Sequence, residues 1–432
     1  MVEMGSSSQP AASRTIEQCI NEYLWHGYLP PRELPEWLWK GLQPAREGTY
    51  SIGEAATCVD NLFDRLCSRF KGPHLVPISG GWDSRLILAA LVERLSTSEI
   101  ETVSFGCPGQ LDFDLGREIA RSAGVRHHAL NLGEVELEWS ALVDSVRTSP
   151  WTYVPDGYFN ALARKSVATS GTVWSGFMGD PLTGGHFKAG NPTASQAVEM
   201  FRTWQRRSRD LPLSATGFVP AYPEMPDTTD LPYRRTELLD FGIRQVGCIA
   251  PIVLPGHSWT KWSVEQGSEE TGAQIVAPFC DPGWASFWIR APRHLHVGQR
   301  LFIETCRHKY SRLFSLPSKH TLGFNPSAHV RKRLYAVQLR LRARLQKKLP
   351  KLQLASRALL NYIDFQWAFR ARGDYVDLIE QAVRTLENHG AVPWLDLRSI
   401  WREHRTHRKD RSDALLLLLG LALNLEARVP YR

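Results

Sequence analysis

Residues 74–176 alternate between short apolar runs and stretches with helical spacing. Stretches 84–95 and 112–124 carry apolar residues at helical spacing, and Gly124 is a suitable C-cap for the second. The apolar runs are typical of buried strands and occupy 74–79, 101–106, 126–132 and 171–176. This alternation predicts right-handed βαβ units. The expected fold class is therefore α/β, with a doubly wound, mostly parallel sheet.

The pattern differs on either side of this region and predicts four segments. These are a disordered leader (1–14), a mostly helical linker or remnant region (15–72), the main α/β domain (73–330) and a basic helical region (331–432). The leucine-rich stretch 414–425 is too short to span a bilayer and predicts a buried helix. Five prolines in 209–232 predict an irregular excursion, which is either a lid over a substrate or a passive surface loop.

Composition narrows the class of protein. The chain has 432 residues, of which 43% are apolar, so it is long enough for a large globular core. Its seven cysteines form no C-x-x-C pair, which argues against a structural zinc site or a disulfide framework. No secretory signal is recognisable at the start of the sequence. A cytoplasmic protein without a membrane span is therefore expected.

The positive charge is concentrated in one stretch. The net charge is +8, but residues 331–351 hold nine Lys or Arg and no acidic residue. Leu334, Val337, Leu341 and Leu345 fall at helical spacing within it, which predicts an amphipathic helix. Two interpretations stay open. The basic face is simply solvated, or it docks a nucleic acid, an anionic membrane or an acidic partner.

The most informative polar residues follow the first predicted strand. Ser79, Gly80, Gly81, Asp83 and Ser84 lie between this strand and the next helix, at the sheet edge where doubly wound folds bind ligands. Backbone N–H groups and serine hydroxyls there suit a phosphate, and the helix N-terminus adds positive potential. A carboxylate at such a place is explained if it holds Mg²⁺. The segment is neither a P-loop nor a dinucleotide fingerprint.

A second glycine-rich turn follows the fourth predicted strand. Residues 173–186 read VWSGFMGDPLTGGH and carry one carboxylate, Asp180. Asp83 and Asp180 could therefore share a Mg²⁺ at the ends of two strands. His186 either faces a nucleotide or is a plain turn residue. Arg85 either contacts a phosphate or pairs with acids on a helix surface.

S-G-G-x-D-S after a strand is the pyrophosphate loop of ATP pyrophosphatases, and with the second turn it resembles the synthetase domain of the asparagine synthetase family. The resemblance runs from about residue 20 to 330. It implies ATP and Mg²⁺ as cofactors, with Gly176 at the nucleotide and both Asp83 and Asp180 on the metal. Further segments resemble the family: SFG (Ser104, Phe105, Gly106) at the adenine, PFCD (278–281), and LPSKHTLGF (316–324). In the last, Lys319 would steady charge that develops during adenylation.

The chain also departs from the family pattern. Phe177 stands where asparagine synthetases have Glu and β-lactam synthetases have Tyr, and a phenyl ring transfers no proton. Pro181 replaces an acid, and Gln274 and Val276 replace the usual Glu and Arg. Position 2 is Val2, not the nucleophilic cysteine of a glutaminase domain, and no such domain is expected before the loop. Conversion of aspartate to asparagine is therefore not the expected reaction.

The resemblance implies an AMP-forming carbon–nitrogen ligase. It would adenylate a carboxylate, release pyrophosphate, and transfer the acyl group to ammonia or an amine, with a separate glutaminase as one source of ammonia. The carboxylate could belong to a small metabolite, a sugar acid or a peptide. Two alternatives remain at this stage: a tRNA-modifying enzyme of the lysidine synthetase type, and an inactive scaffold that binds ATP. The first predicts salt-dependent RNA binding, and the second predicts no turnover.

Overall fold

The computed structural model describes most of the chain. The described residues are 14–32, 50–167, 171–187, 193–207, 210–213, 218–223, 235–254, 274–325, 328–348 and 357–428. Most of the proline-rich excursion, including two of its five prolines, and all of the leader except its last residue lie outside this set.

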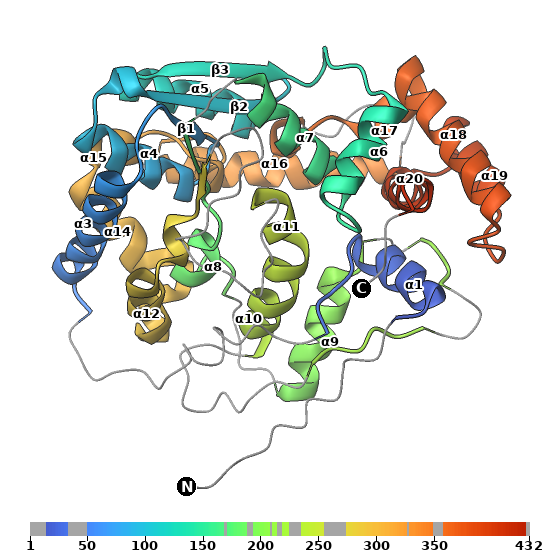
Figure 1. Cartoon of the computed structure of the whole chain (residues 1–432), viewed down its shortest axis with the longest axis horizontal. Coiled ribbons are helices and arrows are strands. Elements are labelled where there is room, and N and C mark those ends of the chain that lie inside the picture. The colour runs from blue at the N-terminus through green and yellow to red at the C-terminus, as the bar shows by residue number, and fades with distance from the viewer. Residues whose placement is uncertain are drawn as a thin grey trace, which may run out of the picture.

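The sheet has five strands that all run parallel, which confirms the expected α/β class (Figure 1). Its order is β3-β2-β1-β4-β5, and His74 of β1 pairs with Ile100 on one side and Thr172 on the other. The strands are β1 (His74–Pro77), β2 (Ile100–Gly106), β3 (Arg126–Asn131), β4 (Thr172–Trp174) and β5 (Gln274–Val276).

The strand order places a topological switch point between β1 and β4. From β1 the chain first adds strands on one side (β2, then β3) and then on the other (β4, then β5). Connections therefore leave β1 and β4 in opposite directions, which opens a crevice beyond their carboxyl ends. Both predicted glycine-rich turns follow these two strands, so the topology sets them side by side.

Two of the longer helices, α1 and α3, precede β1, and further helices connect the strands of the sheet. They are α1 (Ile16–His26), α3 (Ile52–Arg69), α4 (Asp83–Arg94), η1 (Thr97–Glu99), α5 (Leu111–Ala123), α6 (Trp139–Thr148), α7 (Val154–Ser166), α8 (Gly179–Thr183), α9 (Ala194–Gln205) and α10 (Arg235–Leu239). A π-helix, η2 (Asp240–Ile249), and α11 (Ala250–Val253) follow.

The helices after β5 lead into the helical C-terminal region, which is confirmed. They are η4 (Pro278–Cys280), α12 (Pro282–Arg290), α13 (Arg293–His296), η5 (Val297–Gln299), α14 (Arg300–Lys309), α15 (Ser311–Phe314), η6 (Lys319–Thr321), α16 (His329–Lys348), η7 (Arg357–Leu359), α17 (Phe365–Ala371), α18 (Gly373–His389), α19 (Leu397–Arg405) and α20 (Ser412–Glu426).

Helices cover both faces of the sheet. Side chains alternate along β2, so Ser104 and Phe105 point to opposite faces. Ser104 meets α5, where a Cβ on Gly116 would lie 3.1 Å from the Ser104 Cβ. Phe105 faces the side of α7 and lines a cavity there together with Asn160. The sheet is thus a middle layer between helices, as a doubly wound fold requires.

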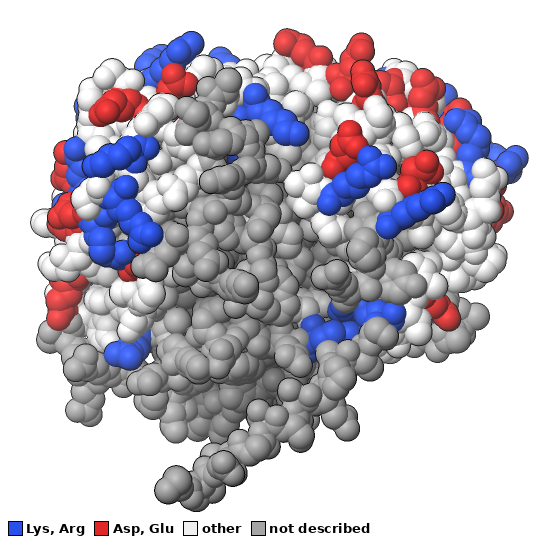
Figure 2. Space-filling view, viewed as in Figure 1, with Lys and Arg blue, Asp and Glu red and all other residues white. Residues whose placement is uncertain are grey.

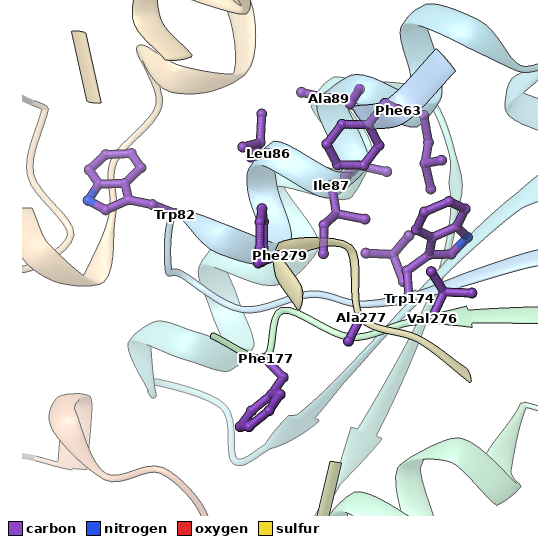
Figure 3. Close-up of a cluster of buried hydrophobic side chains, with 14 of the residues drawn as sticks. Phe63, Trp82, Leu86, Ile87, Ala89, Trp174, Phe177, Val276, Ala277 and Phe279 are labelled. Atoms are coloured by element: carbon purple, nitrogen blue, oxygen red, sulfur yellow. The ribbon is translucent and has the colours of Figure 1, made fainter. Parts of the chain in front are cut away.

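Two large hydrophobic cores lie among the described residues, beside a smaller cluster around Tyr28 and Ile243. The first is built on the sheet and joins α3, α4, α12 and α14; Figure 3 shows part of it around Ile87 and Trp174. The second joins α1 to α6, α7 and the C-terminal helices α17–α20. The leucine-rich stretch forms α20, and its side chains from Ala414 to Leu423 are buried as expected. No helix among the described residues is long and apolar enough to cross a membrane.

Candidate active site

Internal hydrogen bonds stabilise the first glycine-rich turn, which follows β1. The Ser79 N–H donates to Ser84 Oγ (3.3 Å), and the Gly81 N–H donates to Ser79 Oγ (3.2 Å). Helix α4 begins at Asp83 with no side-chain cap. Its first N–H groups are therefore available to an anionic ligand, and the helix dipole favours negative charge at this end.

The second glycine-rich turn lies directly against the first. A Cβ on Gly176 would come within 3.3 Å of the Asp83 Cβ, and a Cβ on Gly179 would overlap the Asp83 carboxylate. The Asp180 N–H donates to Asp83 Oδ2 at 2.7 Å. Gly179 has no Cβ and so leaves room for the Asp83 carboxylate, while Gly176 lets the second turn pack closely on Asp83. The expected pairing of Asp83 with Asp180 is thus present in the geometry.

The electrostatics of this pair point to a cation. Asp83 is half-buried, and its Oδ1, which is shielded from solvent, has no hydrogen-bond partner within the described part of the chain. Burial first, and then the nearby Asp180 carboxylate, raise the pKa of Asp83 well above its usual value. Two carboxylates with one intervening N–H fit Mg²⁺, which favours carboxylate oxygens completed by phosphate oxygens. Among described residues no cluster of three or more acidic, His or Cys side chains could hold a metal by itself.

Lys319 reaches the same cavity from a distant part of the sequence. Its backbone N–H donates to the Gly80 carbonyl (2.9 Å), which anchors the 316–324 segment to the first turn. Its Nζ donates to Asp112 Oδ2 (2.5 Å) and Asn361 Oδ1 (2.9 Å). Ser79, Gly81, Asp83, Ser84, Asp112, Gly176, Asp180 and Lys319 all line one cavity of about 420 Å³.

The residues predicted to contact adenine do not all face this cavity. Phe105 lines it. Ser104 instead turns to the opposite face of the sheet, where its Oγ hydrogen-bonds His127 Nε2 at 3.1 Å. Gly106 has φ +148°, and a Cβ there would lie 2.7 Å from Gln110 Oε1. Strand alternation explains the difference, because neighbouring residues of β2 cannot point to the same face.

Asp112 was not identified from the sequence. Besides holding the Lys319 ammonium, it accepts the Gly80 N–H at Oδ1 (3.1 Å). The Asp112 carboxylate therefore holds both the first glycine-rich turn and the Lys319 side chain in place by hydrogen bonds. Its position in the first turn of α5 gave no signal beyond the usual preference for acids there.

Both interpretations of Arg85 were wrong. Arg85 is fully buried, and its guanidinium donates to three carbonyl oxygens, those of Leu313 (3.1 Å), Leu316 (3.1 Å) and Pro317 (2.7 Å). It also stacks over the Trp82 ring at 4.7 Å. Arg85 therefore clamps the segment that precedes Lys319 onto α4.

Asp281 stabilises the fold around a helix start and an ion pair. Asp281 caps α12 by accepting the N–H groups of Gly283 and Trp284, and it pairs with Arg65 of α3. Pro278 and Phe279 are buried in the core of the sheet. The PFCD segment thus supports the site from outside the cavity.

A second cavity adjoins the first and shares Asp83, Phe105 and Asp180 with it. Its volume is about 320 Å³, and its polar lining includes Asn160, Arg164, Ser175, His186, Arg244 and Gln245. His186 Nδ1 lies 2.5 Å from Asp240 Oδ2. Although burial alone would raise it, His186, Arg244 and Gln245 hold the pKa of Asp240 below its usual value. His186 is therefore a positioned side chain of this cavity as well as a turn residue.

Phe177 also lines this second cavity. In Figure 3 its ring points away from the group formed by Phe63, Ile87 and Trp174. Only 6% of its surface is exposed. The ring therefore presents an apolar wall beside the two carboxylates, where it donates and accepts no proton.

The comparison with known families agrees with this geometry. Residues 65–242 match the family model for asparagine synthase. This part of the chain is an asparagine synthase domain. The match spans both glycine-rich turns, and it ends before the 278–281 and 316–324 segments. No curated protein matches the chain. Residues 65–242 are therefore similar to the domain that ATP-dependent amide ligases of this family carry.

Proposed function

We propose that the protein is an AMP-forming amide ligase that adenylates a substrate carboxylate and transfers the acyl group to ammonia or an amine. The observation that carries the proposal is the meeting of both glycine-rich turns, with Asp83, Asp180 and Lys319, in one cavity of an asparagine synthase domain. ATP is the nucleotide that we expect there, with its phosphates at the N-terminus of α4.

The first step would form a mixed anhydride. A carboxylate oxygen of the substrate attacks the α phosphorus of ATP, the bond to the bridging oxygen breaks, and pyrophosphate leaves. The hydroxyls of Ser79 and Ser84 and the first N–H groups of α4 would bind phosphate oxygens. Asp83 and Asp180 would hold Mg²⁺, which neutralises phosphate charge when bound. Lys319, held by Asp112, would stabilise the negative charge that grows on the phosphates.

The second step would form the amide. The amine nitrogen attacks the acyl carbon, AMP leaves, and the nitrogen loses a proton. Phe177 cannot accept that proton. His186 lines the same cavity and is oriented by Asp240, so we assign it as the proton acceptor. Arg164 and Arg244 would attract the carboxylate-bearing substrate into the cavity.

The substrate is expected to be larger than aspartate. The cavity beside Phe177 shares Arg244 and Ile249 with a third cavity of about 820 Å³. This third cavity extends to Tyr362 and to the start of α20. A sugar acid or a peptide would fill both spaces, whereas a small amino acid would leave the larger one unused.

Product analysis tests the proposal. The purified protein is incubated with Mg-ATP, pools of carboxylates, and ammonium or primary amines, and AMP is separated from ADP. We expect AMP and pyrophosphate to form with one of the carboxylate pools and not with the others. Neither product should form with the Asp83→Asn variant. Asp144→Asn is the matched control, because Asp144 is an exposed residue of α6 that lines neither cavity of the site. ADP and phosphate as products would overturn the proposal.

A further inference from the structure

Helix α16 carries an apolar stripe that the rest of the described structure leaves uncovered. At 100° per residue its outer apolar side chains fall within one narrow sector of the helix. Their exposed fractions are high: Val330 71%, Leu334 66%, Val337 52%, Leu341 53% and Leu345 43%. Single exposed apolar residues are ordinary on a soluble protein, but a continuous row along a helix marks an interaction site.

The opposite side of α16 faces the protein. Tyr335, Ala336 and Leu339 are half-buried, and the Tyr335 ring contacts Phe324 at a centroid distance of 5.4 Å. Beyond such local contacts, α16 packs extensively against no other described helix or strand. The helix therefore lies along the surface with its inner face toward the protein and its apolar stripe toward the outside (orange in Figure 1).

Arginines border the stripe on both sides. By helical geometry Arg331 and Arg342 lie along one border, and Arg333, Arg340 and Arg344 along the other. No acidic residue occurs in His329–Lys348. The face shown in Figure 2 differs, because acidic and basic side chains are interspersed along its rim. The charge on α16 thus favours an anionic partner, and the stripe favours an apolar one.

We propose that α16 docks the protein on the surface of a bilayer that contains anionic lipids. The stripe inserts below the headgroups, and the arginines on both borders bind lipid phosphates, for which a guanidinium is well suited. Long arginine side chains reach outward to the headgroups while the apolar residues stay below them. A nucleic acid would use the arginines but leave the stripe uncovered. The inference concerns a surface and is independent of the proposed reaction.

Sedimentation of the full chain with vesicles tests this docking. We expect binding to vesicles of phosphatidylcholine with phosphatidylglycerol, weaker binding as salt is raised, and little binding to phosphatidylcholine alone. Leu334→Ser with Leu341→Ser should reduce the bound fraction severalfold. Arg333→Gln with Arg344→Gln should reduce it similarly. Thermal unfolding of each variant shows whether it still folds.

Two matched controls separate α16 from general surface effects. Arg402→Gln with Arg408→Gln removes exposed positive charge outside α16, and Val219→Ser with Val297→Ser removes exposed apolar side chains elsewhere. Both should bind vesicles as the wild type does. The proposal is overturned if the protein binds no anionic vesicle, if the controls lose binding equally, or if the leucine variant binds like the wild type. Binding to tRNA that needs the arginines but not the leucines would assign the surface to nucleic acid instead.

Discussion

The backbone N–H of Asp180 donates a hydrogen bond of 2.7 Å to Oδ2 of Asp83. This bond joins the turn after β4 to the first turn of α4, so two segments that lie far apart in the sequence form one site. It also holds two carboxylates close together with a single N–H between them. Both the proposed catalysis and the stability of the ligand-free protein depend on this pair.

Replacing Asp83 tests the catalytic role of the pair. Asp83→Asn keeps the size of the side chain and removes its charge. We expect AMP formation to fall by about 100-fold or more, as when other preorganised charge-stabilising groups are removed. The measurement is the initial rate of AMP release with the active carboxylate pool. A rate close to that of the wild type would contradict the role of Asp83.

The same pair should make the stability of the ligand-free protein depend on pH. Burial and Asp180 raise the pKa of Asp83 above its unfolded value near 3.8. Between those two pKa values the folded state binds more protons than the unfolded state, so the free energy of unfolding falls as pH rises. We expect Asp83→Asn to flatten this decline in urea unfolding followed from acid to neutral pH. Identical pH profiles for the variant and the wild type would contradict the raised pKa.

Asp112 should act as a positioning residue for Lys319. Asp112→Asn can still accept the Gly80 N–H, but it removes the charge that holds the ammonium. We expect kcat for AMP formation to fall about tenfold or more, since a misplaced group of this kind loses that much, while KM for ATP changes little. Asp114→Asn, an exposed position of the same helix, is the control. A change in KM for ATP alone, or an equal loss of kcat in Asp114→Asn, would contradict the role of Asp112 in positioning Lys319.

Arg85 should matter for stability. Arg85→Met keeps an unbranched side chain but leaves the carbonyls of Leu316 and Pro317 without their side-chain donor, whereas the Leu313 carbonyl keeps the Leu316 N–H. Each buried group that loses its partner costs about 1–3 kcal/mol, so we expect a large drop in the urea midpoint. Arg147→Met provides a control, because Arg147 and its ion-pair partner Asp144 are both exposed. Equal midpoints for Arg85→Met and the wild type would contradict the clamp.

The fold could be predicted because its signals are local. Apolar runs and helical spacing between residues 74 and 176 specify βαβ units, and parallel strands bring the turns after β1 and β4 to the same edge. The pairing of Asp83 with Asp180 follows from that topology. Gly124 has φ +78° and ends α5 as expected, because a left-handed C-cap needs a glycine.

The remaining site contacts depend on tertiary packing and carry no local signal. Asp112 meets Lys319 across more than two hundred residues, and neither the helix start nor the LPSKHTLGF segment shows this in its own sequence. Arg85 was interpreted as a surface or phosphate-binding residue because its carbonyl partners come from residues 313–317. The spacing of Leu334 and Leu341 predicted a helix, but periodicity alone could not show that their face of α16 is exposed.

Isotope transfer measures the central step most directly. Carboxylate pools labelled with ¹⁸O are incubated with the protein, Mg-ATP and an amine, and the AMP is examined by mass spectrometry. Attack of the carboxylate on the α phosphorus predicts that AMP carries one ¹⁸O atom from the substrate when the amide forms. AMP without the label, or label in inorganic phosphate alongside ADP, would contradict an acyl adenylate.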